Sequence, residues 1–327
     1  MVKRFIILLA LFSIMIFSMN CEENKPSQYS IEQGDKHLSL IGQFDTPGDA
    51  RDVHVSGSYA YIASDYSGIQ IVDISDKANP FLAGEHDTPR KAYGVYLRGN
   101  IAYLADGKDG VKLFNVVSPQ YPTLAGECPA PYIARAVTVA GDYAYTASSF
   151  GYMWVINISD PHEPVPLNRN YLPYVSEDIC YQGDLLFLTV GYEGIHVFDI
   201  SNPGYPQALG SIDTPRYARS SFVSGNYLYV ADDEAGLQIF DISDISNPQL
   251  VGNFNTPGLA YGVFVSGDYA YIADGSAGLC VIDISDKTNP SYVDIHDTLS
   301  YAISVYYSNG YIYVIDLNQG LSIFRLM

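Results

Sequence analysis

The segment Gly278-Leu-Cys-Val-Ile-Asp-Ile-Ser285 decides the fold, because close copies of it recur along the whole chain. In each copy a glycine precedes an alternating apolar run, and the seven glycines are Gly68, Gly110, Gly151, Gly194, Gly236, Gly278 and Gly320. Their successive spacings are 42, 41, 43, 42, 42 and 42 residues. A period of about 42 residues with strand-like content is typical of propeller blades. The sequence therefore predicts an all-β, seven-bladed β-propeller.

One repeat, from Ala260 to His296, predicts four antiparallel strands. Two alternating runs flank Gly267-Asp268, which is a two-residue turn signal. The run after Gly278 is the third strand, and the segment after Pro290 is the fourth. No amphipathic helix pattern follows Cys21. Four-stranded antiparallel blades are the consequence.

The two ends of the chain complement each other. The last repeat stops at Met327, directly after its third strand. The missing fourth strand stands at the other end, because the segment 38–47 (LSLIGQFDTP) matches the segment 81–89 (FLAGEHDTP). We therefore expect the N-terminal strand to complete the last blade and remove an open sheet edge. Residues 37–327 form a single propeller domain in this interpretation.

The first twenty residues read as a signal peptide. Lys3 and Arg4 precede thirteen uncharged residues, a stretch too short for a stable membrane span. The next residues, Ser18-Met19-Asn20-Cys21, resemble a bacterial lipobox, although Ser18 and Met19 depart from its usual pattern. We expect Cys21 to be lipidated, residues 21–36 to be a tether, and the protein to lie at the bacterial cell envelope, on the outer membrane or cell surface. A plain secretory signal with an incidental cysteine is the alternative.

Composition limits the partners. Without Lys3 and Arg4 the chain keeps 15 basic residues against 36 acidic ones. Such a surface repels nucleic acid and anionic membranes, so the lipid is the only expected membrane contact. Cys128, Cys180 and Cys280 read as small apolar residues, with a Cys128–Cys180 disulfide as the alternative. The scattered histidines predict no metal site and no cofactor, although the Asp-rich loop after Ala231 leaves a structural cation open.

Three copies of the repeat carry a family resemblance. The segments starting at Ile69 (IQIVDIS), Leu237 (LQIFDIS) and Leu279 (LCVIDIS) resemble the LVIVD repeat of bacterial surface and secreted proteins. The resemblance runs from about Leu38 to the C-terminus. It implies a propeller at the cell envelope, commonly without a defined enzymatic activity, and it brings no catalytic residues.

Constant residues of the repeat have an architectural explanation. The motif aspartates are expected to accept hydrogen bonds at the turn after the third strand, and the Asp-Thr-Pro triplets to form the crossing into the next blade. Asn or Arg replaces the aspartate in three copies, where we expect the turn to close differently. The aspartates are Asp73, Asp199, Asp241 and Asp283, the triplets begin at Asp45, Asp87 and Asp213, and the replacements are Asn115, Asn157 and Arg325.

One variable column stands out within this frame. Directly after the residue that begins each first strand come Arg51, Tyr93, Arg135, Glu177, Arg219, Tyr261 and Ile303, and the crossings add Arg90, Lys91, Tyr132, Tyr174, Arg216, Tyr217 and Tyr301. Arg and Tyr together suit a polar recognition surface. We expect the first six column residues to bind a ligand. The alternative is internal pairing of the arginines with Asp106, Asp232, Asp274 and Asp316.

The sequence thus predicts a monomeric, non-enzymatic binding scaffold for a protein or carbohydrate. One rival is an extracytoplasmic carbohydrate-active enzyme that uses acids around the channel, because Glu177 lies beside Asp178 in the column region. Another is a structural subunit of an envelope complex that makes contact through the edge of the ring. No catalytic motif of the common hydrolase or metalloprotease types occurs.

Overall fold

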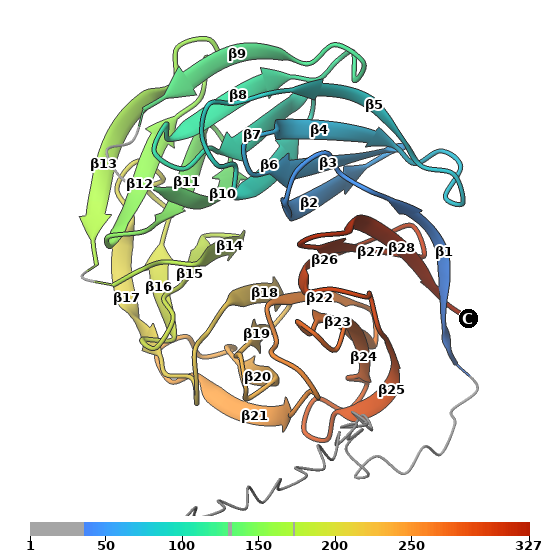
Figure 1. Cartoon of the computed structure of the whole chain (residues 1–327). Coiled ribbons are helices and arrows are strands. Elements are labelled where there is room, and N and C mark those ends of the chain that lie inside the picture. Colours follow the sequence, from blue (N-terminus) through green and yellow to red (C-terminus); the bar gives the residue numbers. More distant parts are fainter. Residues whose placement is uncertain (1–35, 130–132, 173) are drawn as a thin grey trace, which may run out of the picture. The chain divides into compact units, whose positions relative to one another are not determined.

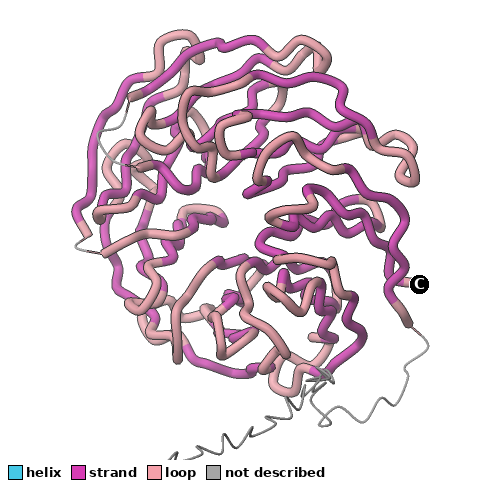
Figure 2. Tube along the Cα trace, viewed as in Figure 1, coloured by secondary structure: helices cyan, strands magenta, loops and turns pink. Residues whose placement is uncertain are grey.

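A computed structural model describes residues 36–129, 133–172 and 174–327. The expected signal peptide 1–20, the lipidation site Cys21 and all of the tether except Lys36 lie outside these residues. The described chain forms seven four-stranded antiparallel sheets arranged as the blades of a ring (Figure 1). Figure 2 shows strands and loops but no helix in this part of the chain. The predicted seven-bladed propeller is confirmed.

Each blade runs from an inner strand beside the centre to an outer strand at the periphery of the ring. From inside to outside, the first four blades are β2 (Ala50–Ser56), β3 (Tyr59–Ser64), β4 (Gly68–Asp73), β5 (Phe81–His86); β6 (Gly94–Arg98), β7 (Ile101–Ala105), β8 (Val111–Asn115), β9 (Thr123–Cys128); β10 (Ala134–Ala140), β11 (Tyr143–Ser148), β12 (Tyr152–Asn157), β13 (Val165–Tyr171); and β14 (Asp178–Gln182), β15 (Leu185–Thr189), β16 (Ile195–Asp199), β17 (Gln207–Ile212).

The last three blades follow the same order. They are β18 (Ser220–Ser224), β19 (Tyr227–Ala231), β20 (Leu237–Asp241), β21 (Gln249–Phe254); β22 (Gly262–Ser266), β23 (Tyr269–Ala273), β24 (Leu279–Asp283), β25 (Ser291–His296); and β26 (Ala302–Ser308), β27 (Tyr311–Asp316), β28 (Gly320–Leu326), β1 (Leu38–Phe44). Residues 36–129, 133–172 and 174–327 contain no helix long and apolar enough to cross a membrane.

The hydrophobic core is divided into layers between neighbouring blades. One cluster joins Leu237 and Ile239 of the fifth blade to Val263 and Ile272 of the sixth. Six further clusters join the other neighbouring pairs, including the seventh blade with the first. A blade buries its two faces only against its neighbours, so the ring is stable as a whole.

Steric constraints explain why a glycine stands before the third strand of each repeat. Gly278 has a φ of +84°, and a Cβ there would lie 2.2 Å from the carbonyl oxygen of His296. Only glycine adopts this conformation at such a close backbone approach without strain. The constant glycine of the sequence signature is therefore required where the third strand begins beside the end of the fourth.

The turns after the third strands close as expected, and in the same way where Asn replaces Asp. The Asp283 Oδ1 accepts a hydrogen bond of 2.8 Å from the backbone N–H of Ser285. Asn157 Oδ1 accepts the equivalent bond from Ser159 N–H at 2.9 Å, and Asn115 does so from Val117 N–H at 3.0 Å. The expectation of a different closure was wrong for these two blades, because an amide oxygen accepts this bond as well as a carboxylate.

The ring closes between the two ends of the described chain. Strand β1 pairs antiparallel with β28, from Leu38 opposite Leu326 to Phe44 opposite Leu321. His37 and Met327 extend the ladder by exchanging two backbone hydrogen bonds of 2.9 Å. The predicted completion of the last blade by the N-terminal strand is thus observed.

We predict that the closing strand is held mainly through its buried side chain. Leu38 is 7% exposed, whereas Leu40 on the same strand is 40% exposed. The substitution Leu38→Ala should lower the free energy of unfolding by about 2–3 kcal/mol, because it leaves a cavity. The matched control Leu40→Ala should change it by less than about 0.5 kcal/mol. Chemical denaturation measures both, and equal effects would contradict this account of closure.

Candidate central binding site

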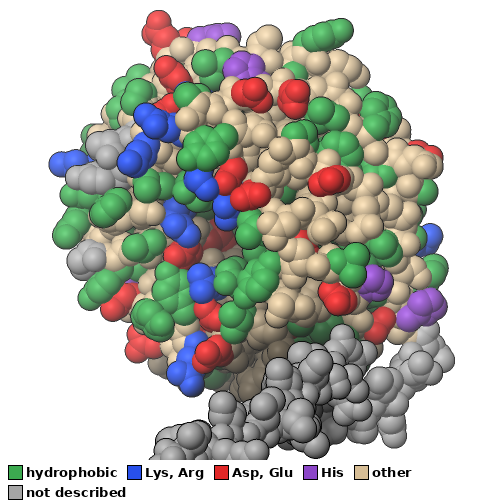
Figure 3. Space-filling view, viewed as in Figure 1, with side chains coloured by type: hydrophobic (Ala, Val, Ile, Leu, Met, Phe, Trp, Pro, Cys, Tyr) green, Lys and Arg blue, Asp and Glu red, His purple; other side chains and the backbone are tan. Residues whose placement is uncertain are grey.

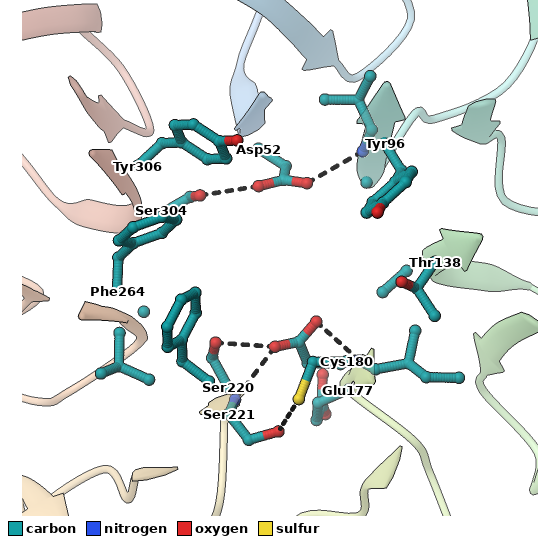
Figure 4. A pocket seen from close by; sticks show the side chains of 18 of the residues that line it. Asp52, Tyr96, Thr138, Glu177, Cys180, Ser220, Ser221, Phe264, Ser304 and Tyr306 are labelled. Atoms are coloured by element: carbon teal, nitrogen blue, oxygen red, sulfur yellow. Dashed lines mark hydrogen bonds between the residues drawn. The ribbon is translucent and has the colours of Figure 1, made fainter. Parts of the chain in front are cut away.

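The inner strands surround a central cavity. Each of the seven strands pairs with its own blade on one side only, so its other edge faces the centre of the ring. The cavity has a volume of about 470 Å³ and is lined by residues of all seven inner strands (Figure 4). Unpaired backbone N–H and C=O groups along such edges are donors and acceptors for water or a polar ligand.

All seven residues of the variable column line this cavity. Arg51 and Arg135 lie at irregular positions at the start of β2 and β10, where the strand register shifts by one residue. A bulge of this kind redirects a side chain away from the normal alternation of a strand. The six predicted binding residues Arg51, Tyr93, Arg135, Glu177, Arg219 and Tyr261 are therefore brought together at one place.

The three column arginines form ion pairs, but with other acids than expected. Arg51 Nε lies 2.7 Å from Asp65 Oδ1, and Arg219 Nη2 lies 2.7 Å from Asp233 Oδ2. The third blade has no acid at the equivalent loop position. Its Arg135 instead reaches Glu177 of the next blade, with 2.5 Å between Nη2 and Oε2. These pairs connect the column internally and leave the arginine side chains 25–32% exposed.

The acids that were expected to pair with the column arginines form hydrogen bonds within the crossings instead. Asp106, Asp274 and Asp316 are fully buried and accept bonds of 2.5–2.7 Å from the hydroxyl groups of Thr88, Thr256 and Thr298 in the crossings. Asp232, equally buried, accepts a bond from the backbone N–H of Arg216. Pairing of the arginines with these four residues was a wrong expectation, because they are buried beneath the crossings and already bonded there.

Aromatic contacts also connect the column residues, which form the rim of the central cavity at its mouth. The Arg219 guanidinium lies 4.5 Å from the ring centre of Tyr217 and 4.6 Å from that of Tyr261, a cation–π arrangement on both sides. The Tyr217 hydroxyl donates to Glu177 at 2.5 Å. Tyr301 packs edge-on against Tyr261. The crossing residues Tyr217 and Tyr301 therefore support the column, whereas Tyr132 lies outside the described residues.

Two further carboxylates line the cavity: Asp178, which the sequence offered only for the rival enzyme interpretation, and Asp52, which was not identified as a site residue. Asp52 accepts bonds from Ser304 Oγ, Val53 N–H and Val95 N–H at 2.8–3.0 Å, and thereby joins three blades. Burial raises the pKa of Asp52 to about 6. Figure 4 shows Asp52 and its bond to Ser304 at the cavity wall. The sequence contained one signal for these carboxylates. At the position that directly follows the column residue, the other five blades have only Gly, Ala or Ser.

Asp178 occupies the same position in the fourth blade. It accepts bonds from Ser220 Oγ at 2.8 Å, from Ser221 N–H at 3.1 Å and from Ile179 N–H at 2.7 Å. Burial raises the pKa of Asp178 as well. Both carboxylates therefore hold neighbouring blades together and give the cavity wall a negative potential.

Aromatic side chains line the cavity three residues beyond the column. Phe264 packs against Phe222 and Tyr306, with ring centres 4.5 Å and 4.9 Å apart. His54 lies between Tyr306 and Tyr96, and burial lowers its pKa to about 4, so it is neutral at physiological pH. The cavity thus passes from a charged rim through a carboxylate wall to an aromatic layer.

The three cysteines of the described residues are free thiols. Cys128 and Cys280 are buried, and Cys180 lines the cavity with its sulfur 3.4 Å from Ser221 Oγ. The alternative of a Cys128–Cys180 disulfide is not realised. Within the described residues, no group of three or more His, Cys, Asp or Glu side chains is placed to hold a metal ion.

The fold and its site define a class: a seven-bladed propeller with a polar, charged cavity mouth. A family model described as "LVIVD repeat" matches residues 47–88, 89–129, 133–171, 175–214, 215–256 and 257–298, and the chain belongs to this family. The seventh blade, divided between the two ends of the domain, is outside the six matches. No curated protein matches the chain.

Solved structures share the fold at low sequence identity. The β-propeller domain of Cps50 (Swd1) from Myceliophteria thermophila is 13% identical with a TM-score of 0.72, covering 89% of this chain and 100% of that one. The WD40 β-propeller domain of Doa1 is 12% identical with a TM-score of 0.68, covering 88% and 97%. The computationally designed protein Ika8 is 10% identical with a TM-score of 0.66, covering 88% and 100%. These likenesses concern the fold alone.

We predict that mild acid stabilises the ring. Burial raises the pKa of Asp52, Asp232 and Asp274 from 3.8 to about 6, so the folded chain takes up these protons before the unfolded chain does. Their contribution to stability therefore grows as the pH falls from about 7 to about 4. His54 and His196 act in the opposite direction, because burial lowers their pKa. Burial also raises the pKa of Asp106 and Asp178, so the carboxylates outnumber the two imidazoles.

The midpoint of thermal unfolding should consequently be higher at about pH 5 than at about pH 7.5. Differential scanning calorimetry measures it. High salt serves as the control, because it screens the repulsion between surface carboxylates but not the cost of burying a charge. A midpoint that stays constant or falls between these two pH values would show that the buried carboxylates are not destabilised.

Proposed function

We propose that this protein is a non-enzymatic binding protein that takes up a protein or carbohydrate ligand at the mouth of its central cavity. One observation carries the proposal: the six residues that vary within the otherwise constant repeat, Arg51, Tyr93, Arg135, Glu177, Arg219 and Tyr261, converge on a single cavity. A scaffold needs the same residue in every blade, whereas recognition of one ligand needs different groups at defined places.

The rim is suited to binding because its side chains are held in place and its arginines remain partly exposed to solvent. Arg135 pairs with Glu177 through one of its N–H groups, and within the described residues no other acid pairs with it. Arg219 is fixed between two tyrosine rings and by Asp233. Side chains fixed before binding lose little conformational entropy when a ligand arrives, which favours affinity.

The geometry favours binding over carbohydrate hydrolysis. Glu177 is neutralised by Arg135 and bonded by Tyr217, so it is not poised as a nucleophile or general acid. Asp52 and Asp178 each accept three hydrogen bonds from neighbouring blades. A retaining or inverting glycosidase needs two carboxyl groups directed at the scissile bond, and these groups serve the scaffold instead.

We further propose that the protein acts as a monomer tethered to the bacterial cell envelope through Cys21. The support is the basic start of the chain, the uncharged run and the lipobox-like segment before Cys21. Expression in a bacterial host with labelled palmitate should label the protein, and the substitution Cys21→Ser should abolish the label and release the protein from the membrane fraction. Unchanged labelling of the Cys21→Ser variant would reject lipidation at this residue.

We predict that the rim arginines are needed for binding and not for folding. Changing Arg51, Arg135 and Arg219 together to Gln should reduce binding to oligosaccharide and peptide arrays at least about tenfold, because charge-assisted bonds are lost. Asp65 keeps Lys91 and Glu177 keeps Tyr217, so that of the three acids only Asp233 loses its ion pair, and the melting temperature should stay within a few degrees.

The control variant changes Arg98, Lys77 and Lys287 to Gln, because it removes the same charge from the opposite face of the ring. It should bind like the unchanged protein. Unfolding of the rim variant would show that the arginines serve the scaffold, and undiminished binding by a folded rim variant would refute the proposed site.

A further inference from the structure

A second, smaller cavity lies beside the mouth of the central one. It has a volume of about 160 Å³ and is lined by Tyr66, Arg90, Lys91, Tyr93, Gly107, Lys108 and Ile133. Tyr93 lines both cavities, so the two spaces are adjacent. We call the smaller cavity the side pocket. Its size suits one sugar ring or one small acid group, and its position lets a ligand extend past Tyr93 into the centre.

The side pocket is basic in a chain whose net charge is −19. Lys91 Nζ lies 2.6 Å from Asp65 Oδ2, and the same carboxylate also binds Arg51, which has Asp49 as a second acid at 3.8 Å. Arg90 pairs with Asp109 at 3.2 Å and remains 56% exposed. Within the described part of the chain Lys108 has no acidic partner, and it is exposed. The charged side chains in the lining of the side pocket are all basic, so positive charge is in excess there.

The pocket also offers a flat aromatic wall. Tyr66, at the tip of the loop after β3, is 63% exposed, and the Lys91 ammonium lies 5.4 Å from its ring centre. Figure 3 shows basic side chains gathered on one side of the ring face, the left side in that view, with few on the right. A cationic pocket with an aromatic wall favours a ring that carries a negative group.

The interior of the central cavity, beyond the arginines at its mouth, has the opposite preference. The carboxylates of Asp52 and Asp178 line it and repel a second negative charge. The oxygens of Ser220 and Ser304, whose O–H groups donate to Asp178 and Asp52, supply acceptors for hydroxyl groups instead, and the unpaired strand edges supply donors and acceptors. A ligand that fills both spaces therefore carries one anionic group at one end and neutral, hydroxyl-rich groups at the other.

We propose that the two cavities bind one oligosaccharide that has a single acidic sugar. Its carboxylate lies in the side pocket between Arg90, Lys91 and Lys108, and its neutral sugars continue past Tyr93 into the central cavity. The assignment rests on the proposed function, since it takes the central cavity as a binding site. Polyanionic glycans and acidic peptides fit less well, because their further charges meet Asp52, Asp178 and the acidic surface of the ring.

The test uses an array of matched probes: neutral oligosaccharides, the same backbones with one uronic acid, polyuronates and acidic peptides. The protein should bind singly acidic members at least about tenfold more tightly than their neutral counterparts, and high salt should weaken this preference. Lys108→Gln should remove most of the preference, since it deletes a charge without leaving an unpaired acid. Lys287→Gln, which removes one charge on the opposite face, should leave the preference unchanged.

Four outcomes would overturn the assignment: equal binding of neutral and acidic members, a preference for polyuronates or acidic peptides, an unaltered preference in the Lys108→Gln variant, or no binding of any acidic glycan. The two proposals fail separately. Binding that depends on Arg135 and Arg219 but not on charge or Lys108 would keep the central site and reject the acidic sugar. Binding that depends on Lys108 but not on the column arginines would reject the central site.

Discussion

The hydrogen-bonded closure between β1 and β28 is the constraint on which the rest of the structure depends. Every blade buries its faces against two neighbours, so an open ring would expose one apolar layer at each end and an unpaired outer edge on β28. Closure also fixes the circumference, and thereby the size of the central cavity. The bond from Ser304 to Asp52, between residues 252 positions apart, exists only because the first and last blades meet.

Two kinds of position follow from this closed geometry. Some positions meet the same surroundings in every blade, as Gly278 does where its backbone approaches His296 and Asp283 does where it closes a turn. Others face the centre of the ring, where all blades converge and each side chain meets different neighbours. Arg135 illustrates this: its own loop lacks an acid, so it pairs with Glu177 of the next blade. Chemical variety therefore concentrates at the centre.

The sequence was sufficient for the fold, because period, alternation and the displaced strand at residues 38–44 are local or repeated signals. It was sufficient for the column too, since a fixed offset within a blade places equivalent residues at equivalent points. The ion-pair partners of the arginines could not be predicted from the sequence. Neighbouring loop residues such as Asp232 and Asp233 differ in whether they lie beneath a crossing or face the rim, and this depends on the packing of the loops. The side pocket combines Tyr66 of one blade with Lys108 of the next, and only the packing of blades brings these together.

The buried carboxylates connect the stability of the ring with the selectivity of its cavity. Asp52 joins three blades through its hydrogen bonds, and the same burial that raises its pKa leaves its charge poorly screened by solvent. A charge kept in such surroundings acts strongly on whatever enters the cavity, because the local dielectric constant is low. In the proposed binding mode, hydroxyl groups therefore lie beside Asp52 and Asp178, and the anionic group lies outside, among the arginines and lysines at the cavity mouth.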